Sequence, residues 1–264
     1  MIRSIYLKTL YQKRWMTFWW VIGVVAMVSF TLLFFPTLKN SNLAETFAQL
    51  PVQFAKLAGD SLSFNSIQGY VGEQLFGLRL PIMTIILAIT LFTGLTATEE
   101  DRGTLASQLT LPISRTRLLI EKFLAATTIL AIIHIAIGIG IILTLIGIHE
   151  SLSILRLVQT LLGCLLLSLS IGSFVFFIGA ATGLRSLAIG VSSYIVFQSY
   201  LLSSLVSSID ELKTIEQISL FHYFPSLQVM RHGPNGSDTL VFVGVILTFL
   251  ALACITFKRR DIRN

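Results

Sequence analysis

The most polar segment of the chain is residues 99–122, EEDRGTLASQLTLPISRTRLLIEK, which places eight charged side chains among twenty-four residues. The acids that open it are Glu99, Glu100 and Asp101, Arg102 follows them directly, and the candidate cationic partners further along are Arg115, Arg117 and Lys122. A long apolar run precedes the acids, and acid at the C-terminal end of a helix opposes the helix dipole. We therefore expect these carboxylates to pair with the cations of the same segment.

Two residues inside this segment predict a break followed by a new helix. Gly103 interrupts the preceding helix, and Thr104 can act as the N-cap of the next one. Leu105 and Leu109 are four residues apart, so they share one face of a helix of about two turns. The pattern predicts a short helix within a polar connection.

Pro112 and Ser114 predict where this short helix ends and the next long one begins. Proline biases the residue before it away from helical geometry, and Ser114 is a natural N-cap for a long helix that starts at Arg115. The short helix is thus held between two long ones. Two interpretations fit the residues alone: an ordinary solvated loop, or a docking element for another protein.

The chain lacks the familiar sequence motifs of catalysis. No G-x-x-x-x-G-K-[ST] occurs and no Gly is followed by Lys, so no loop of the type that cradles ATP phosphates is present. H-E-x-x-H and G-x-S-x-G are also missing. We expect no catalytic residue, metal site or cofactor in this chain. If ATP supplies energy, another polypeptide must bind it.

Three residues within apolar runs are further candidates for function or packing. His134 lies near the middle of the third run, where an ionisable group is a candidate for transport or coupling. The alternative is a neutral imidazole that is bonded to a neighbouring backbone group or hydroxyl. Gly179 and Gly183 form a small-xxx-small pair that permits close helix approach, either within the chain or between two copies.

The elements that must position these residues are membrane-spanning helices. The chain has 264 residues, of which 54% are hydrophobic and 12% charged, whereas soluble domains carry about 25% charged residues. Six runs are free of Asp, Glu, Lys and Arg and are long enough to cross a bilayer. They are residues 15–38, 80–98, 123–148, 157–184, 186–209 and 239–257. We predict an all-α polytopic membrane protein whose residues 1–264 form a single transmembrane domain.

The basic residues predict the orientation of these six spans. An even number of spans puts both termini on one side, and that side holds 13 of the Lys and Arg residues in 46 positions, against 6 in 78 on the other. Cytoplasmic segments carry the excess of Lys and Arg. Both termini and residues 99–122 are therefore expected to be cytoplasmic. This asymmetry accounts for the net charge of +6, and we expect no nucleic-acid partner.

Three segments outside the spans also have a predicted structure. Residues 1–14 fit a basic amphipathic helix in the membrane interface, or equally an extension of the first span. The external loop of residues 39–79 is expected to contain two short helices, at about 42–50 and 51–58. The external loop of residues 210–238 is dense in apolar side chains, so we expect it to be partly re-entrant, tucked back into the protein.

The polar segment resembles the cytoplasmic loop of ABC-2-type transporter permeases. In that family the loop runs from acid to Gly-Thr-Leu, then Pro-x-Ser-Arg, and then a Lys that enters the third span, as residues 99–122 do. The segments GYVGEQLF, GLRSLAIG and FHYFP also fit the family layout. The chain departs from the common pattern at Ala106, where Glu is frequent, and at Gln108, where Leu is frequent.

The resemblance implies a permease subunit of a bacterial ABC exporter in the prokaryotic inner membrane. It implies that residues 99–122 hold a coupling helix that docks on a cytoplasmic ATPase, with two ATPase copies per complex and a second permease subunit, identical or homologous. ATP and Mg would sit on the ATPase. It implies coupling roles for Glu99, Glu100, Gly103, Thr104, Leu105, Leu109, Pro112, Ser114, Arg115 and Lys122. The rival interpretation is a secondary transporter or channel that works without an ATPase.

Overall fold

The computed structural model describes residues 4–39, 66–109, 113–206 and 217–260, and within these ranges all regular structure is helical. Six helical segments in these ranges are long and apolar enough to cross a membrane. They are Ile5–Lys39, Ile67–Gly94, Arg115–Gly147, Ile154–Thr182, Arg185–Ser203 and Gly236–Arg259. The prediction of an all-helical protein with six such helices is confirmed.

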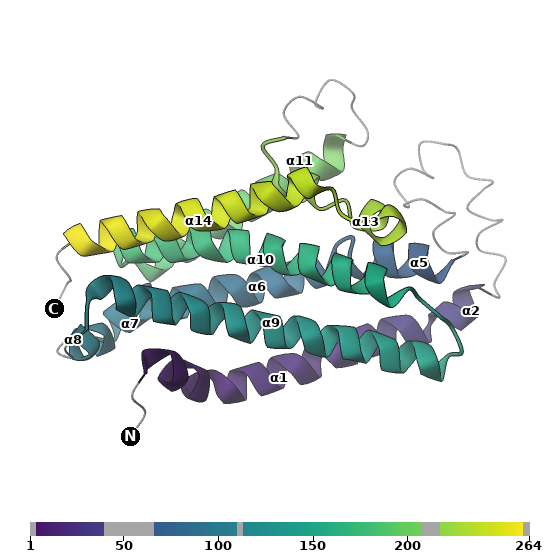
Figure 1. The fold of residues 1–264 in the computed structure, drawn as a ribbon, viewed down its shortest axis with the longest axis horizontal. Helices are drawn as coiled ribbons and strands as arrows, with labels where there is room; N and C mark the ends of the chain where they lie inside the picture. Colours follow the sequence, from purple (N-terminus) through teal and green to yellow (C-terminus); the bar gives the residue numbers. More distant parts are fainter. Residues whose placement is uncertain (1–3, 40–65, 110–112, 207–216, 261–264) are drawn as a thin grey trace.

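These segments contain the long helices of Figure 1. The first comprises α1 (Ile5–Leu33) and α2 (Phe35–Lys39), and the second comprises α5 (Ile67–Tyr70), the π-helical η2 (Val71–Leu75) and α6 (Arg79–Gly94). The others are α9 (Arg115–Gly147), α10 (Ile154–Thr182), α11 (Arg185–Val206) and α14 (Gly236–Arg259). Shorter helices are α7 (Ala97–Asp101), α8 (Thr104–Leu109), η4 (Leu220–Tyr223) and α13 (Ser226–His232).

The first two spans begin earlier than predicted. α1 is continuous from Ile5 to Leu33, so residues 5–14 extend the first span, which was one of the two alternatives considered, and do not form a separate interfacial helix. No glycine or proline interrupts this stretch before Gly23, which explains the continuity. The second span begins at Ile67, where the Ser66 side chain accepts a hydrogen bond from the Gly69 amide as its N-cap. Residues 67–79 therefore belong to a helical segment, where a loop was predicted.

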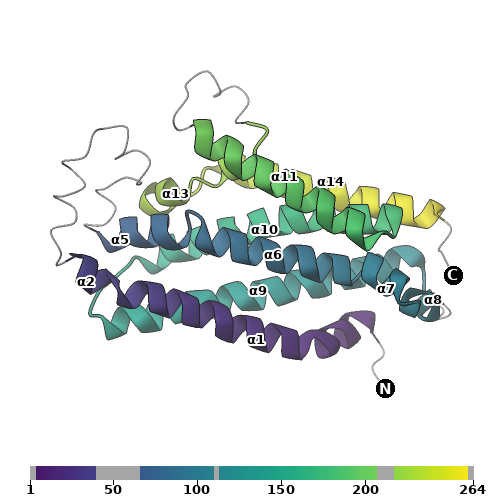
Figure 2. The same cartoon turned by 180° about the vertical axis from the view of Figure 1, so that it is seen from behind.

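The long helices lie side by side and run the length of the molecule. α1 packs along α9, and α10 packs on α6, α9, α11 and α14, so α10 is the central helix. Figure 1 shows α9, α10 and α14 on one side, and Figure 2 shows α6 and α11 on the other. A triad of Phe92, Phe123 and Phe176, with ring centroids 5.3–5.7 Å apart, joins α6, α9 and α10 in the core.

The two ends of the bundle carry different elements. One end, here called the terminus end, holds both chain termini together with α7 and α8 (Figures 1 and 2). The opposite end holds α2, α5 and α13. The polar segment of residues 99–122 thus lies at the same end as the termini, as six crossings require.

The described part of the loop between α11 and α14 packs against the bundle. α13 contacts α10, α5 and η2, and the side chains of Phe221, Phe224 and Met230 are buried. The short helices predicted at 42–50 and 51–58 lie outside the described residues, as do residues 210–216 of the second external loop.

Candidate coupling site at the terminus end

A buried ion pair joins α7 to α9. The Lys122 side chain is only 1% exposed, and its ammonium lies 2.6 Å from Glu99 Oε2. The same ammonium donates a hydrogen bond of 3.1 Å to the carbonyl of Leu95, at the end of α6. A buried charge is stable only when it is paired and hydrogen-bonded. Lys122 therefore ties α9 both to α7 and to the end of α6.

Glu99 also connects α7 to α8. Its Oε2 accepts a second hydrogen bond of 2.6 Å from Gln108 Nε2, and its carbonyl accepts one from the Thr104 hydroxyl at 3.1 Å. Between the two helices Gly103 has a φ of +67°, a conformation that favours glycine. Leu105 is 2% exposed and belongs to the core. α8 is thus folded back onto the chain; we call α7, α8 and the turn between them the bracket.

Glu100 anchors the bracket to the C-terminal ends of α10 and α14. Its carboxylate pairs with the Arg260 guanidinium, which also donates to the carbonyl of Ala180 at 3.0 Å. The Arg115 guanidinium donates to the carbonyl of Arg260 at 2.8 Å. Gly183 ends α10 with a φ of +68°, and a Cβ at this position would overlap both members of the ion pair. The absence of a side chain at Gly183 leaves the space that the pair occupies.

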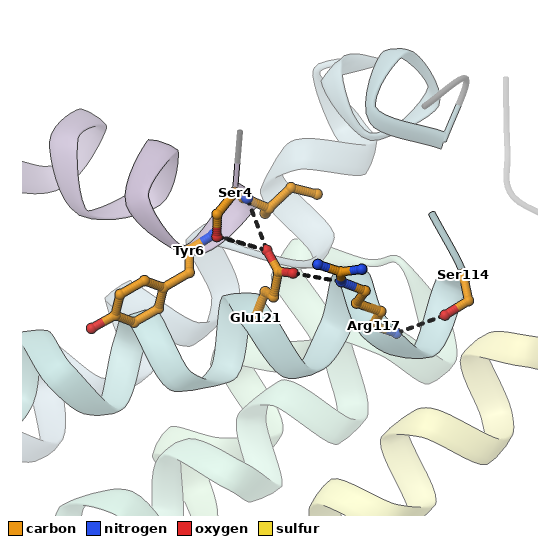
Figure 3. Close-up of polar contacts among 6 residues, drawn as sticks. Ser4, Tyr6, Ser114, Arg117 and Glu121 are labelled. Carbon is orange, nitrogen blue, oxygen red and sulfur yellow. Dashed lines mark hydrogen bonds and ion pairs between the residues drawn. The ribbon is translucent and has the colours of Figure 1, made fainter. Parts of the chain in front are cut away.

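Glu121 joins the beginning of α1 to α9, as Figure 3 shows. Its Oε2 accepts hydrogen bonds from the Ser4 hydroxyl and from the amides of Ile5 and Tyr6, at 2.8–3.2 Å. Its Oε1 accepts from Arg117 Nε at 2.8 Å. The first amides of a helix have no partner within the helix. Glu121 supplies one for α1 from a residue more than a hundred positions away.

Several predicted site residues meet in this cluster, though in different pairs from those expected. Lys122, one of the three candidate cations, pairs with Glu99, and Ser114 caps α9 through a hydrogen bond from the Arg117 amide. Arg117 pairs with Glu121, and Arg115 contacts a backbone carbonyl. Asp101 is exposed. Leu109 ends α8, and Pro112 lies outside the described residues.

Three residues of the cluster were missed by the sequence reasoning. Arg260 and Gln108 pair with Glu100 and Glu99, and Glu121 holds α1. The only local signal was the i,i+4 spacing of Arg117 and Glu121. Their other contacts depend on how distant helices pack, which residue spacing does not reveal.

His134 lies apart from this cluster, in the middle of α9. It is 3% exposed, and its Nδ1 lies 2.8 Å from the Leu130 carbonyl, so Nδ1 carries the proton of that hydrogen bond. Its Nε2 has no hydrogen-bond partner among the described residues. The ring borders an apolar groove of about 320 Å³ between α9 and α10. The backbone bond matches the structural alternative considered for this residue.

Gly179 makes its close contact within the chain. A Cβ at Gly179 would overlap the hydroxyl of Thr96, between α6 and α7. α10 therefore approaches the start of the bracket as closely as the missing side chain allows.

The comparison with protein families agrees with this architecture. The family model described as ABC-2 family transporter protein matches residues 4–262, nearly the whole chain. A comparison with curated proteins gave no match. With six apolar helices and a polar bracket between the second and third, the chain belongs to the ABC-2 family of transporter membrane proteins.

Proposed function

We propose that this permease forms the translocation pathway of an exporter and is driven by a separate ATPase that docks on the bracket. Family membership supports the transport function, and its members lack a nucleotide-binding domain of their own. The absence of a phosphate-binding motif in the sequence agrees with this division of labour. ATP and Mg would be bound by the ATPase.

The complex that follows from this proposal has two permease chains and two ATPase subunits in a prokaryotic inner membrane. The excess of Lys and Arg supports a cytoplasmic terminus end. The bracket lies at that end, within reach of a cytoplasmic partner. The second permease chain is the same protein or a homologue.

The observation that carries the proposal is the attachment of the bracket to four long helices. Lys122 joins it to α9 and to the last turn of α6, and Arg260 joins it to α10 and α14. A force on the bracket would therefore move the ends of these helices together as a rigid body. The closing of two ATPase subunits can supply such a force.

Where the structure describes the exposure of bracket side chains, the exposed ones lie at and beside its turn. Asp101, Arg102, Gly103 and Thr104 are exposed, whereas Leu105 and Gln108 are buried against the chain. We therefore place the ATPase contact at the turn and assign Leu105 to anchoring α8. For Leu105, this proposal replaces the direct coupling contact that the family resemblance implies, because its side chain is buried within the chain.

Charge reversal at the turn tests the docking proposal. Asp101→Arg should reduce co-purification of the partner ATPase at least tenfold, because Asp101 is exposed and has no described structural role. Asp238→Arg, the same change at the opposite end of the bundle, is the matched control and should leave co-purification unchanged. Thermal unfolding of the purified permease verifies that both variants are folded. Full ATPase recovery with Asp101→Arg would overturn the docking position.

A further inference from the structure

A basic pocket lies at the terminus end, beside the ion pair of Glu99 and Lys122, and Glu99 forms part of its lining. It has a volume of about 510 Å³ and opens between the first turns of α1, the end of α6, the bracket and the start of α11. These elements face the side of the molecule seen in Figure 2. Four basic residues from three parts of the chain line it: Lys8, Lys13, Arg102 and Arg185.

Among the described residues, no carboxylate forms an ion pair with the cations of this pocket. The acid of the pocket is Glu99, whose carboxylate already binds Lys122 and Gln108. Like charges held together repel one another, so an anion in the pocket would be bound favourably.

The surroundings of the pocket indicate that this anion belongs to a lipid. Lys8 and Gln12 line the pocket, and Trp15 and Trp19 continue the same face of α1 at helical spacing. Both tryptophans are highly exposed, at 62% and 65%. Exposed tryptophan next to basic residues is typical of the level of lipid headgroups. A headgroup in the pocket would leave its acyl chains against this apolar face.

We propose that the pocket binds the phosphate-bearing headgroup of an anionic phospholipid, with the acyl chains lying along Trp15 and Trp19. Lys8, Arg102 and Arg185 supply the charge at the mouth, and Lys13 supplies it deeper in the pocket. The lipid would connect α1 and α11 to the bracket. The site requires no ATPase, so it can be tested on the permease alone.

Tryptophan fluorescence gives a direct assay, because all three tryptophans, Trp15, Trp19 and Trp20, lie in α1. The purified full chain in detergent is titrated with brominated phosphatidylglycerol or brominated phosphatidylcholine, whose bromines quench nearby tryptophan. We expect phosphatidylglycerol to quench at lower concentration. A basic residue near an anionic lipid surface strengthens binding of the anionic lipid about fivefold. Arg102→Gln with Arg185→Gln should therefore lower the preference for phosphatidylglycerol over phosphatidylcholine by at least fivefold.

The controls separate this site from general charge effects. Lys258→Gln with Arg259→Gln removes two exposed cations at the same end but outside the pocket, and should keep the wild-type preference. Unchanged quenching by phosphatidylcholine shows that each variant is folded. Equal quenching of the wild type by both lipids, or an unchanged preference in the pocket variant, would overturn the proposal. Relief of quenching by excess inorganic phosphate would identify a free-phosphate site and also overturn it.

Discussion

Lys122 brings a charge to the start of an apolar helix, and Glu99 makes that position stable. The sequence made Lys122 one of three candidate cations for the acids of the same segment, without indicating which acid it would pair with. The partners of Glu100 and Glu121 were not foreseeable in this way. Arg260 is 160 residues from Glu100, and Ile5 is 116 residues from Glu121. Such contacts exist only after the helices have packed.

Removing one member of the Lys122–Glu99 pair should lower the free energy of unfolding more than removing both members. Lys122→Met leaves the Glu99 carboxylate in a largely buried site, and we expect a loss of roughly 3 kcal/mol in the free energy of unfolding. Lys122→Met combined with Glu99→Gln should recover most of this stability, because no unpaired charge remains. Chemical unfolding of the purified chain measures both. The interpretation fails if the single variant is as stable as the wild type.

Gln108 shows how a departure from the family pattern can be explained by structure. Where Leu is frequent in the resembling loops, this chain has an amide that donates to Glu99. Through this amide the Glu99 carboxylate contacts Gln108 in α8 and Lys122 in α9 at the same time. A leucine at this position could not provide that hydrogen bond.

Among the elements, the helices themselves were predictable, but only some of their ends were: α9 starts at Arg115 with Ser114 as its N-cap, as the sequence indicated. Runs without charge identified all six spans, because charges are excluded from the lipid interior. The same criterion misplaced the start of the first two helices. A helix continues beyond the membrane core as long as its backbone bonds are satisfied, and α1 does so past Lys13 and Lys8, with Glu121 holding its first amides.

The closeness of α10 to the bracket predicts a sharp difference between two glycines. Gly179→Ala should destabilise the protein by about 1–3 kcal/mol, because the added Cβ would overlap Thr96. Gly190→Ala in α11 is the matched control, since nothing lies within 4 Å of its Cβ position. Thermal unfolding of the two variants in the same detergent measures the difference. Equal melting temperatures would show that α10 can move away from Thr96 without a loss of stability.

For the whole molecule, the predicted orientation has a direct test. In a variant without Cys164 and Cys254, single cysteines are placed at Asp101, at Lys258 and, at the opposite end, at Asn235. We expect a membrane-impermeant maleimide to label only Asn235→Cys in intact cells, because the terminus end carries the positive excess. All three should react after the membrane is opened. Labelling of Asp101→Cys in intact cells would place the bracket outside and exclude docking of a cytoplasmic ATPase.

The pairing of Glu100 with Arg260 has a consequence for biosynthesis. A ribosome adds roughly 5–20 residues per second, so the 160 residues between these partners take on the order of ten seconds to make. During that interval the acid of the nascent chain lacks its cation, and the bracket is unfinished. An ATPase that recognises the finished bracket would engage only permeases whose sixth helix has already been inserted.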